Sequence, residues 1–239
     1  MHDNPLIVSW FFQHRCYLFM EYVLKPIFGV EDFWFRFEWQ HHGSPHLHGV
    51  LWLKDFRLSD TDSLTEEQKH ALVDYFGNMC VAINPTSPEN IPDMHPSRKT
   101  FTDVSESDRL EDLGQLINSF QRHTKCGRHC LRETSRGRGL KCRFDFPKPV
   151  QDNPLISSPN KYPQFLPARN DGYVNRFNPL ITRIWRANTD FTPIISITAV
   201  LNYIAKYASK GEKSSASYVE LINSILSSLS DDCSAKTLV

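Results

Sequence analysis

The chain has 239 residues, 40% of them hydrophobic, and its 27 Lys and Arg residues balance its 27 Asp and Glu residues. This length allows one large domain or two small ones with a real core. No stretch approaches the ~20 apolar residues of a membrane span, and the N-terminus lacks the basic start of a secretory signal, so we expect no membrane segment. Six unevenly placed cysteines are too few for a disulfide scaffold of this size, which favours a reducing compartment.

The zero net charge argues against a generally basic nucleic-acid binder, but the charges are unevenly distributed. Nine Lys and Arg residues lie between Arg122 and Lys148, against only Glu133 and Asp145. This segment predicts a local basic patch.

A helix is expected over 6–24, because apolar residues recur along it in a broad stripe that includes Phe11, Phe12 and Tyr17. We interpret these aromatic side chains as core residues. Lys25-Pro26 is expected to end the helix.

The stretch Phe35–Leu53 predicts a β-hairpin. Phe35, Phe37 and Trp39 alternate with polar residues, which is the period of a half-buried strand. The turn residues from His42 to Pro45 are followed by a second apolar run that continues as strand.

This hairpin predicts a divalent metal site. His46 and His48 fall two apart and therefore project from one face of the return strand. The hairpin brings Glu38 or Gln40 opposite them, and spacing alone does not separate these two candidates. We prefer Glu38, because a carboxylate is the stronger ligand for a hard cation. Two imidazoles favour Mn²⁺ in affinity, whereas Mg²⁺ is more available.

The middle of the chain contains two expected helices, 60–76 and 107–122. Ser63 and Glu66 resemble a capping box for the first of them. The proline-rich segment 84–102 predicts a loop. Two later segments complete this region: 151–172 should be irregular and 173–184 should contain a strand or two.

Four residues in the spacing H-x2-C-x3-C-x11-C predict a structural zinc site: His123, Cys126, Cys130 and Cys142. An imidazole and three thiolates suit tetrahedral zinc and leave no position open for chemistry. His129 is a rival to His123, and free cysteines in a reduced loop are the alternative to a metal site. We interpret Cys16, Cys80 and Cys233, which have no partners in sequence, as ordinary apolar or exposed residues.

Residues 192–208 predict an extended stretch that becomes a helix near Ser196, where Ser196 or Thr198 could supply the cap. On this helix Tyr203 and Tyr207 are four residues apart and lie one above the other. Lys206 and Lys210 lie beside them. A tyrosine near a metal ion can attack a phosphate, and the lysines would bind phosphate and ease deprotonation of the tyrosine.

At these motifs the chain resembles a known family. His46-Leu47-His48 is similar to the His-hydrophobe-His motif of HUH endonucleases. The strings EWQHHGSPHLHGVLW and WRANTDFTPIISITAVLNYIAKYASKGE resemble the N-terminal nuclease domain of Helitron rolling-circle transposases, from about Asn4 to Glu212. The resemblance implies metal-dependent nicking of single-stranded DNA through a transient 5′-phosphotyrosine on Tyr203 or Tyr207, with Lys206 assisting. It also implies a helicase domain in the full-length protein and, in a eukaryotic host, a nuclear location.

The expected fold is α/β (α+β), with a central, mostly antiparallel sheet flanked by helices. The domain should span 1–212 and contain a zinc-binding insertion at 121–149, followed by a linker and terminal helix at 213–239. Family members carry a strand before the first helix, and we expect this sheet to lack it. Candidate DNA-binding residues are Lys210 and Arg143.

Two other functions compete with the nickase. One is a catalytically inactive single-stranded-DNA-binding remnant of a transposase. The other is a metal-dependent phosphoesterase that uses water, with the tyrosines in a structural role.

Overall fold

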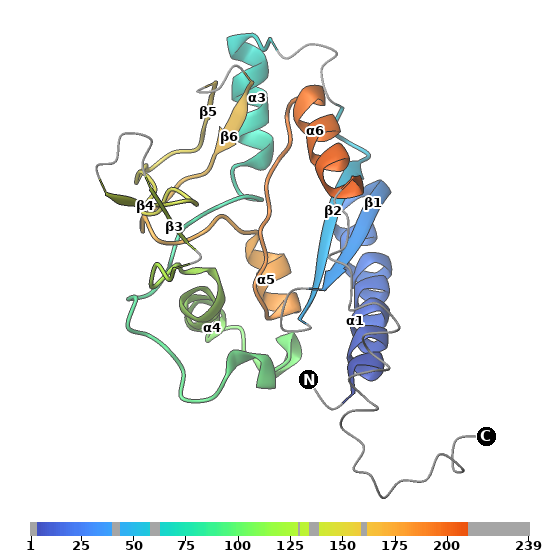
Figure 1. Cartoon of the computed structure of the whole chain (residues 1–239), viewed down its shortest axis with the longest axis vertical. Coiled ribbons are helices and arrows are strands. Elements are labelled where there is room, and N and C mark those ends of the chain that lie inside the picture. Colours follow the sequence, from blue (N-terminus) through green and yellow to red (C-terminus); the bar gives the residue numbers. More distant parts are fainter. Residues whose placement is uncertain are drawn as a thin grey trace, which may run out of the picture. The chain divides into compact units, whose positions relative to one another are not determined.

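The computed structural model describes residues 4–39, 44–57, 63–128, 130–133, 139–158 and 162–209 (Figure 1). The chain divides into two compact units. The hairpin unit consists of Met1–Arg57 and Leu201–Val239, and the middle unit is Leu58–Val200. None of the helices in these ranges is both long enough and apolar enough to cross a bilayer.

The hairpin unit begins with a long helical segment. Helix α1 (Pro5–Phe19) passes through the π-helical turn η1 (Met20–Leu24) into α2 (Lys25–Phe28). The predicted end at Lys25-Pro26 is wrong, because the Lys25 N–H bonds to Met20 O across the π turn and Pro26 has no N–H to satisfy. Gly29, at a φ of +62°, ends the segment instead.

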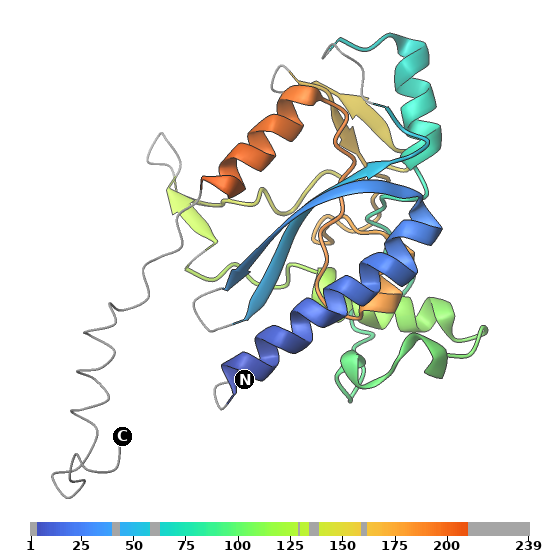
Figure 2. The same cartoon turned by 90° about the vertical axis from the view of Figure 1, so that its right-hand side faces the viewer.

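Strands β1 (Val30–Trp39) and β2 (Pro45–Leu53) form the predicted antiparallel hairpin. Residues 40–43, which include Gln40 and the start of the expected turn, lie outside the described residues. The phenylalanines of β1 project from one face, where Phe37 meets Phe12 of α1 at a ring-centroid distance of 6.0 Å. Helix α6 (Ile197–Ala208) covers the opposite face, so the hairpin lies between two helices (Figure 2).

The outer side of α1 differs from the expectation of core packing. Phe11 and Tyr17 are 58% and 62% exposed, whereas Cys16 and Met20 on the inner side are buried. The apolar residues of this helix therefore lie on two faces, and only the inner face packs against the core.

In the described part of the middle unit, three α-helices lie wholly within it: α3 (Glu66–Phe76), α4 (Arg109–Leu116) and α5 (Pro179–Trp185). The capping box of α3 is made by Thr65 and Gln68, not by Ser63 and Glu66. A π turn, η4 (Ile117–Gln121), extends α4, and two short 3₁₀ turns, η2 (Pro96–Arg98) and η3 (Phe101–Asp103), interrupt the proline-rich loop.

Two short hairpins complete the middle unit: β3 (Leu131–Glu133) with β4 (Leu140–Cys142), and β5 (Leu155–Ser157) with β6 (Gln164–Leu166). The strand expected within 173–184 is wrong: Val174 and Phe177 form only isolated β-bridges, and the second half is helical. Asn178 caps α5 by accepting from Ile181 N, and Pro179 opens the helix.

The described strands therefore form three separate two-stranded antiparallel sheets, instead of the single central sheet that we expected. The architecture is α+β, with mixed helices and small antiparallel sheets. The predicted terminal helix over 218–229 falls outside the described residues.

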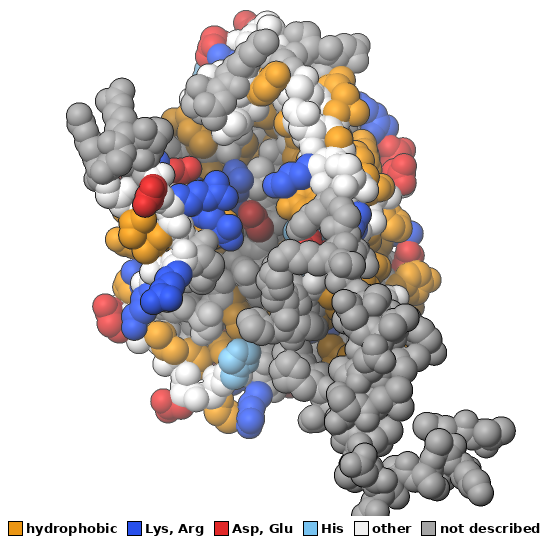
Figure 3. All heavy atoms as spheres, in the orientation of Figure 1, with side chains coloured by type: hydrophobic (Ala, Val, Ile, Leu, Met, Phe, Trp, Pro, Cys, Tyr) orange, Lys and Arg blue, Asp and Glu red, His pale blue; other side chains and the backbone are white. Residues whose placement is uncertain are grey.

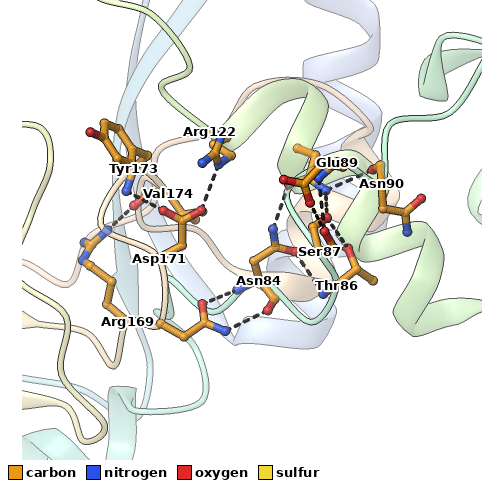
Figure 4. Close-up of polar contacts among 12 residues, drawn as sticks. Asn84, Thr86, Ser87, Glu89, Asn90, Arg122, Arg169, Asp171, Tyr173 and Val174 are labelled. Atoms are coloured by element: carbon orange, nitrogen blue, oxygen red, sulfur yellow. Dashed lines mark hydrogen bonds and ion pairs between the residues drawn. The ribbon is translucent and has the colours of Figure 1, made fainter.

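A small apolar core and a polar network hold the middle unit together. Five residues form the core cluster: Ala82, Leu113, Ile117, Val174 and Phe177. Beside it, Asn84 Nδ2 donates to Asn118 Oδ1 (2.8 Å), and Asp171 accepts from Arg122 Nε (2.8 Å) (Figure 4). The network joins segments far apart in sequence, and its buried amides are hydrogen-bonded as a stable interior requires.

Candidate functional site

The hairpin brings the three predicted metal ligands onto one face. Glu38 lies directly opposite His46 in the ladder, and Arg36 lies opposite His48. Glu38 Oε2 accepts a hydrogen bond from His48 Nε2 at 3.1 Å, and both side chains are 21% exposed. The His46 and His48 ring centroids are 6.4 Å apart.

His46 contributes an unpaired nitrogen. Its Nδ1 atom is buried and has no hydrogen-bond partner among the described residues. A buried polar atom without a partner costs free energy unless a ligand or water satisfies it. Such an atom fits the role of a metal ligand or of a donor to a bound group.

Glu38 and His48 have the spacing of two ligands of one divalent cation, but with His46 included the three side chains together are not a compact ligand group in this structure. Two ligand atoms that share a first-row ion, each at about 2.1 Å, lie roughly 3 Å apart, which is close to the observed contact between Glu38 and His48. His46 lies further from this pair. Two imidazoles and one carboxylate would leave coordination positions open for substrate oxygens.

Helix α6 places a tyrosine against this face. The Tyr207 ring stacks on the His48 ring with centroids 4.1 Å apart and an interplanar angle of 23°. Tyr203, one turn earlier, contacts Tyr207 at 4.7 Å. Ser196 caps the helix by accepting from Ala199 N at 3.2 Å, as predicted.

Two basic side chains lie beside Tyr207. The ammonium group of Lys206 lies 5.2 Å from the centroid of the Tyr207 ring. Arg36 Nη1 donates to Tyr207 O at 2.6 Å. Sequence reasoning identified Lys206 but missed Arg36, whose only signal was its place two residues before Glu38 on the same strand face. Lys210 lies outside the described residues.

The middle unit holds the Cys/His cluster. The ligand atoms of His123, Cys126 and Cys142 all lie within 4.8 Å of one another. His123 Nε2 is 3.1 Å from Cys126 Sγ and 3.7 Å from Cys142 Sγ. The His123 ring also stacks on Phe146 at 4.6 Å, which fixes its orientation. One imidazole and two thiols at this separation could hold a metal ion.

The pKa values of the two cluster thiols shift in opposite directions. For Cys142, burial favours the thiol, but hydrogen bonds from the backbone of Phe146 and Phe144 outweigh it and lower the pKa. For Cys126, desolvation and the neighbouring Cys142 raise the pKa. Cys142 is therefore the first of the pair to become a thiolate, the form that binds metal.

Cys130, the remaining predicted ligand, is not a member of the three-residue cluster. It is 2% exposed and directly precedes Leu131, the ladder partner of Cys142. Cys130 nevertheless lies near the cluster, because its charge is one of the causes that raise the pKa of Cys126. His129 lies outside the described residues. Cys16 and Cys80 are buried thiols, with pKa values raised by burial to about 11 and about 12.

Basic side chains lie near the β3–β4 hairpin of the middle unit, where Figure 3 shows Lys and Arg side chains on the face in view. Arg143, directly after β4, is exposed and its guanidinium carbon lies 4.6 Å from the Phe144 ring centroid. An exposed arginine over an aromatic ring is suited to contact a phosphate or a base.

The N-terminal part of the chain matches a known family. Residues 1–51 match the family model described as "Helitron helicase-like domain at N-terminus". No curated protein and no solved structure matches the chain. The matched segment contains α1, β1 and most of β2, including His46 and His48, whereas α6 and the Cys/His cluster lie beyond it. Residues 1–51 are therefore similar in sequence to a Helitron-like N-terminal domain.

Proposed function

We propose that this protein nicks single-stranded DNA and transfers the cut strand through a 5′-phosphotyrosine intermediate. The observation that carries the proposal is the contact between Tyr207 and His48. It joins a potential nucleophile to a candidate ligand that is itself bonded to Glu38. Proximity of this kind is what a phosphoryl-transfer site requires.

Glu38, His46 and His48 would hold a Mg²⁺ or Mn²⁺ ion. The ion would supply Lewis-acid chemistry, polarising the scissile phosphate and neutralising negative charge in the transition state. The two imidazoles would hold the ion on the strand face, and the Glu38 carboxylate would reduce its net charge.

In the cleavage step, the Tyr207 or Tyr203 oxygen bonds to phosphorus as the bond from phosphorus to the 3′-oxygen breaks. The phenolic proton passes to solvent, and the departing 3′-oxygen takes up a proton. The Lys206 ammonium group stabilises the developing phenolate by its charge. One phosphodiester is exchanged for another, so the freed 3′-hydroxyl can reverse the step without ATP.

The decisive experiment uses a 5′-end-labelled and a 3′-end-labelled single-stranded oligonucleotide with the full chain and Mn²⁺. The proposal expects a protein–DNA adduct, resistant to denaturant, that carries only the 3′-end label. Cut DNA without adduct would indicate a hydrolase. Binding without cutting would indicate an inactive DNA-binding remnant.

We also propose that His123, Cys126 and Cys142 hold a structural zinc ion, with Cys130 as the candidate fourth ligand. The ion would secure the β3–β4 hairpin, and Arg143 beside it would contact DNA, as Lys210 would beyond α6. In a full-length protein of this family, a helicase domain would act with the nickase, in the nucleus of a eukaryotic host.

A further inference from the structure

The C-terminal end of α6 is held by a residue from a distant strand. A helix leaves its last four carbonyls without partners inside the helix. Arg36 of β1 donates from Nη1 to Tyr207 O at 2.6 Å, with Ala208 O a further 3.5 Å contact. Ser209 adds a local bond, from its hydroxyl to Ala205 O at 2.6 Å. The distant contact is therefore made by one charged side chain.

This contact acts on the residue whose ring lies in the candidate site. Arg36 is the ladder partner of His48, and the Tyr207 ring stacks on His48. The paired residues Arg36 and His48 therefore contact Tyr207 at two places. Arg36 binds its carbonyl oxygen, and His48 stacks on its ring. Moving the last turn of α6 would change both contacts together.

We infer that Arg36 is a positioning residue that clamps the last turn of α6 to β1 and so sets the place of the Tyr207 hydroxyl. The clamp itself rests on the hydrogen bonds from Arg36 to Tyr207 O and Ala208 O, whereas its effect on cleavage depends on the proposed nickase function. A positive charge at a helix C-terminus also complements the helix dipole. Arginine suits the task better than lysine, because its planar group holds its donors in a fixed fork.

The test compares Arg36→Met and Arg36→Lys with matched variants of Arg57. Arg57 is in the same unit and also donates to a backbone carbonyl, Leu53 O, but at the far end of the hairpin. Hydrogen exchange of peptides covering 201–209 is measured alongside the maximal rate of adduct formation and the affinity for single-stranded DNA. Folding is checked by the exchange of peptides from the middle unit, which the variants should leave unchanged.

Arg36→Met should speed exchange in 201–209 by about tenfold or more, since a hydrogen bond from a charged donor is lost. It should slow adduct formation by roughly ten- to a hundredfold, as expected for a misplaced nucleophile, with DNA affinity unchanged. Arg36→Lys should recover part of both effects, and Arg57→Met should show neither.

Unchanged exchange in Arg36→Met would overturn the clamp, even if cleavage fell. A loss of DNA affinity that accounts for the slower cleavage would also overturn it, because Arg36 would then be a DNA contact. If the wild-type chain forms no adduct, the nickase proposal fails, and the exchange measurement still decides whether Arg36 holds the helix.

Discussion

The Tyr207 ring stacks on the His48 ring with centroids 4.1 Å apart and an interplanar angle of 23°, although the two residues are far apart in sequence. Tyr203, one turn earlier, contacts the Tyr207 ring with centroids 4.7 Å apart. This difference between the two tyrosines makes their roles testable.

Tyr207→Phe should reduce the first cleavage on the order of 10³-fold or more, because the attacking oxygen is removed while the ring that stacks on His48 remains. Tyr203→Phe should slow it by less than about tenfold. Single-turnover adduct formation measures both, and filter binding confirms that DNA affinity is retained. Equal losses in the two single variants would contradict the assignment of the first attack to Tyr207.

Glu38→Gln should weaken Mn²⁺ binding by about ten- to a hundredfold, since the side chain keeps its shape but loses the charge that attracts a hard cation. Titration calorimetry on the full chain gives the affinity directly. The matched control is Gln40→Ala, which should leave Mn²⁺ affinity unchanged. Weaker Mn²⁺ binding in Gln40→Ala, with unchanged binding in Glu38→Gln, would show that Gln40 is the third ligand.

Cys142→Ser should abolish tight zinc binding, measured by metal analysis after dialysis, and Cys80→Ser should leave one zinc per chain. Because a bound metal displaces the thiol protons, zinc release should increase as the pH falls. Cys130→Ser separates two coordination schemes. Loss of zinc would show that Cys130 joins the cluster when metal is bound, and full retention would show that three protein ligands suffice.

Asp171 predicts a pH dependence of stability. Burial acts against its charged form, but the hydrogen bonds from Arg122 and from the Tyr173 N–H outweigh burial and lower the pKa of Asp171. A carboxyl with a lowered folded-state pKa contributes stability above its unfolded pKa of about 4, and this contribution is lost as pH falls through the folded value.

Asp171→Asn should therefore lower the free energy of unfolding by about 1–3 kcal/mol at pH 7, and the deficit should shrink below about pH 4. Urea denaturation at several pH values measures it. Asp190→Asn is the control. Asp190 is 62% exposed and lies 3.6 Å from Arg176, so its loss should cost under about 1 kcal/mol. A deficit in Asp171→Asn that does not change with pH would contradict the argument.

The hairpin was predictable because alternation, turn residues and the His-x-His spacing all agreed, and the structure confirms the pairing of Glu38 with His46. The sequence did not identify the first residue of α3, because Ser63 with Glu66 and Thr65 with Gln68 both fit the capping pattern. In the structure, Thr65 and Gln68 form the capping box. In α5, the Asn178-Pro179 start signal prevailed over an apolar run that also suits a strand.

Other features were beyond sequence reasoning for a physical reason. The Arg36 contact joins residues 171 positions apart, and local patterns carry no information about such a pair. The grouping of Cys142 with His123 and Cys126, without Cys130, depends on the three-dimensional arrangement of the side chains, which the spacing of cysteines does not specify.

In sequence, the middle unit is inserted between β2 and the last two turns of α6, and this order matters during synthesis. The strand face that carries His46 and His48 leaves the ribosome early, but Tyr207 follows about 160 residues later, after the whole of the middle unit. At about 5–20 residues per second, this delay amounts to roughly 8–30 seconds. During that interval a nascent chain has the candidate ion-binding face but no nucleophile, so under the proposed chemistry it cannot cut DNA before α6 is complete.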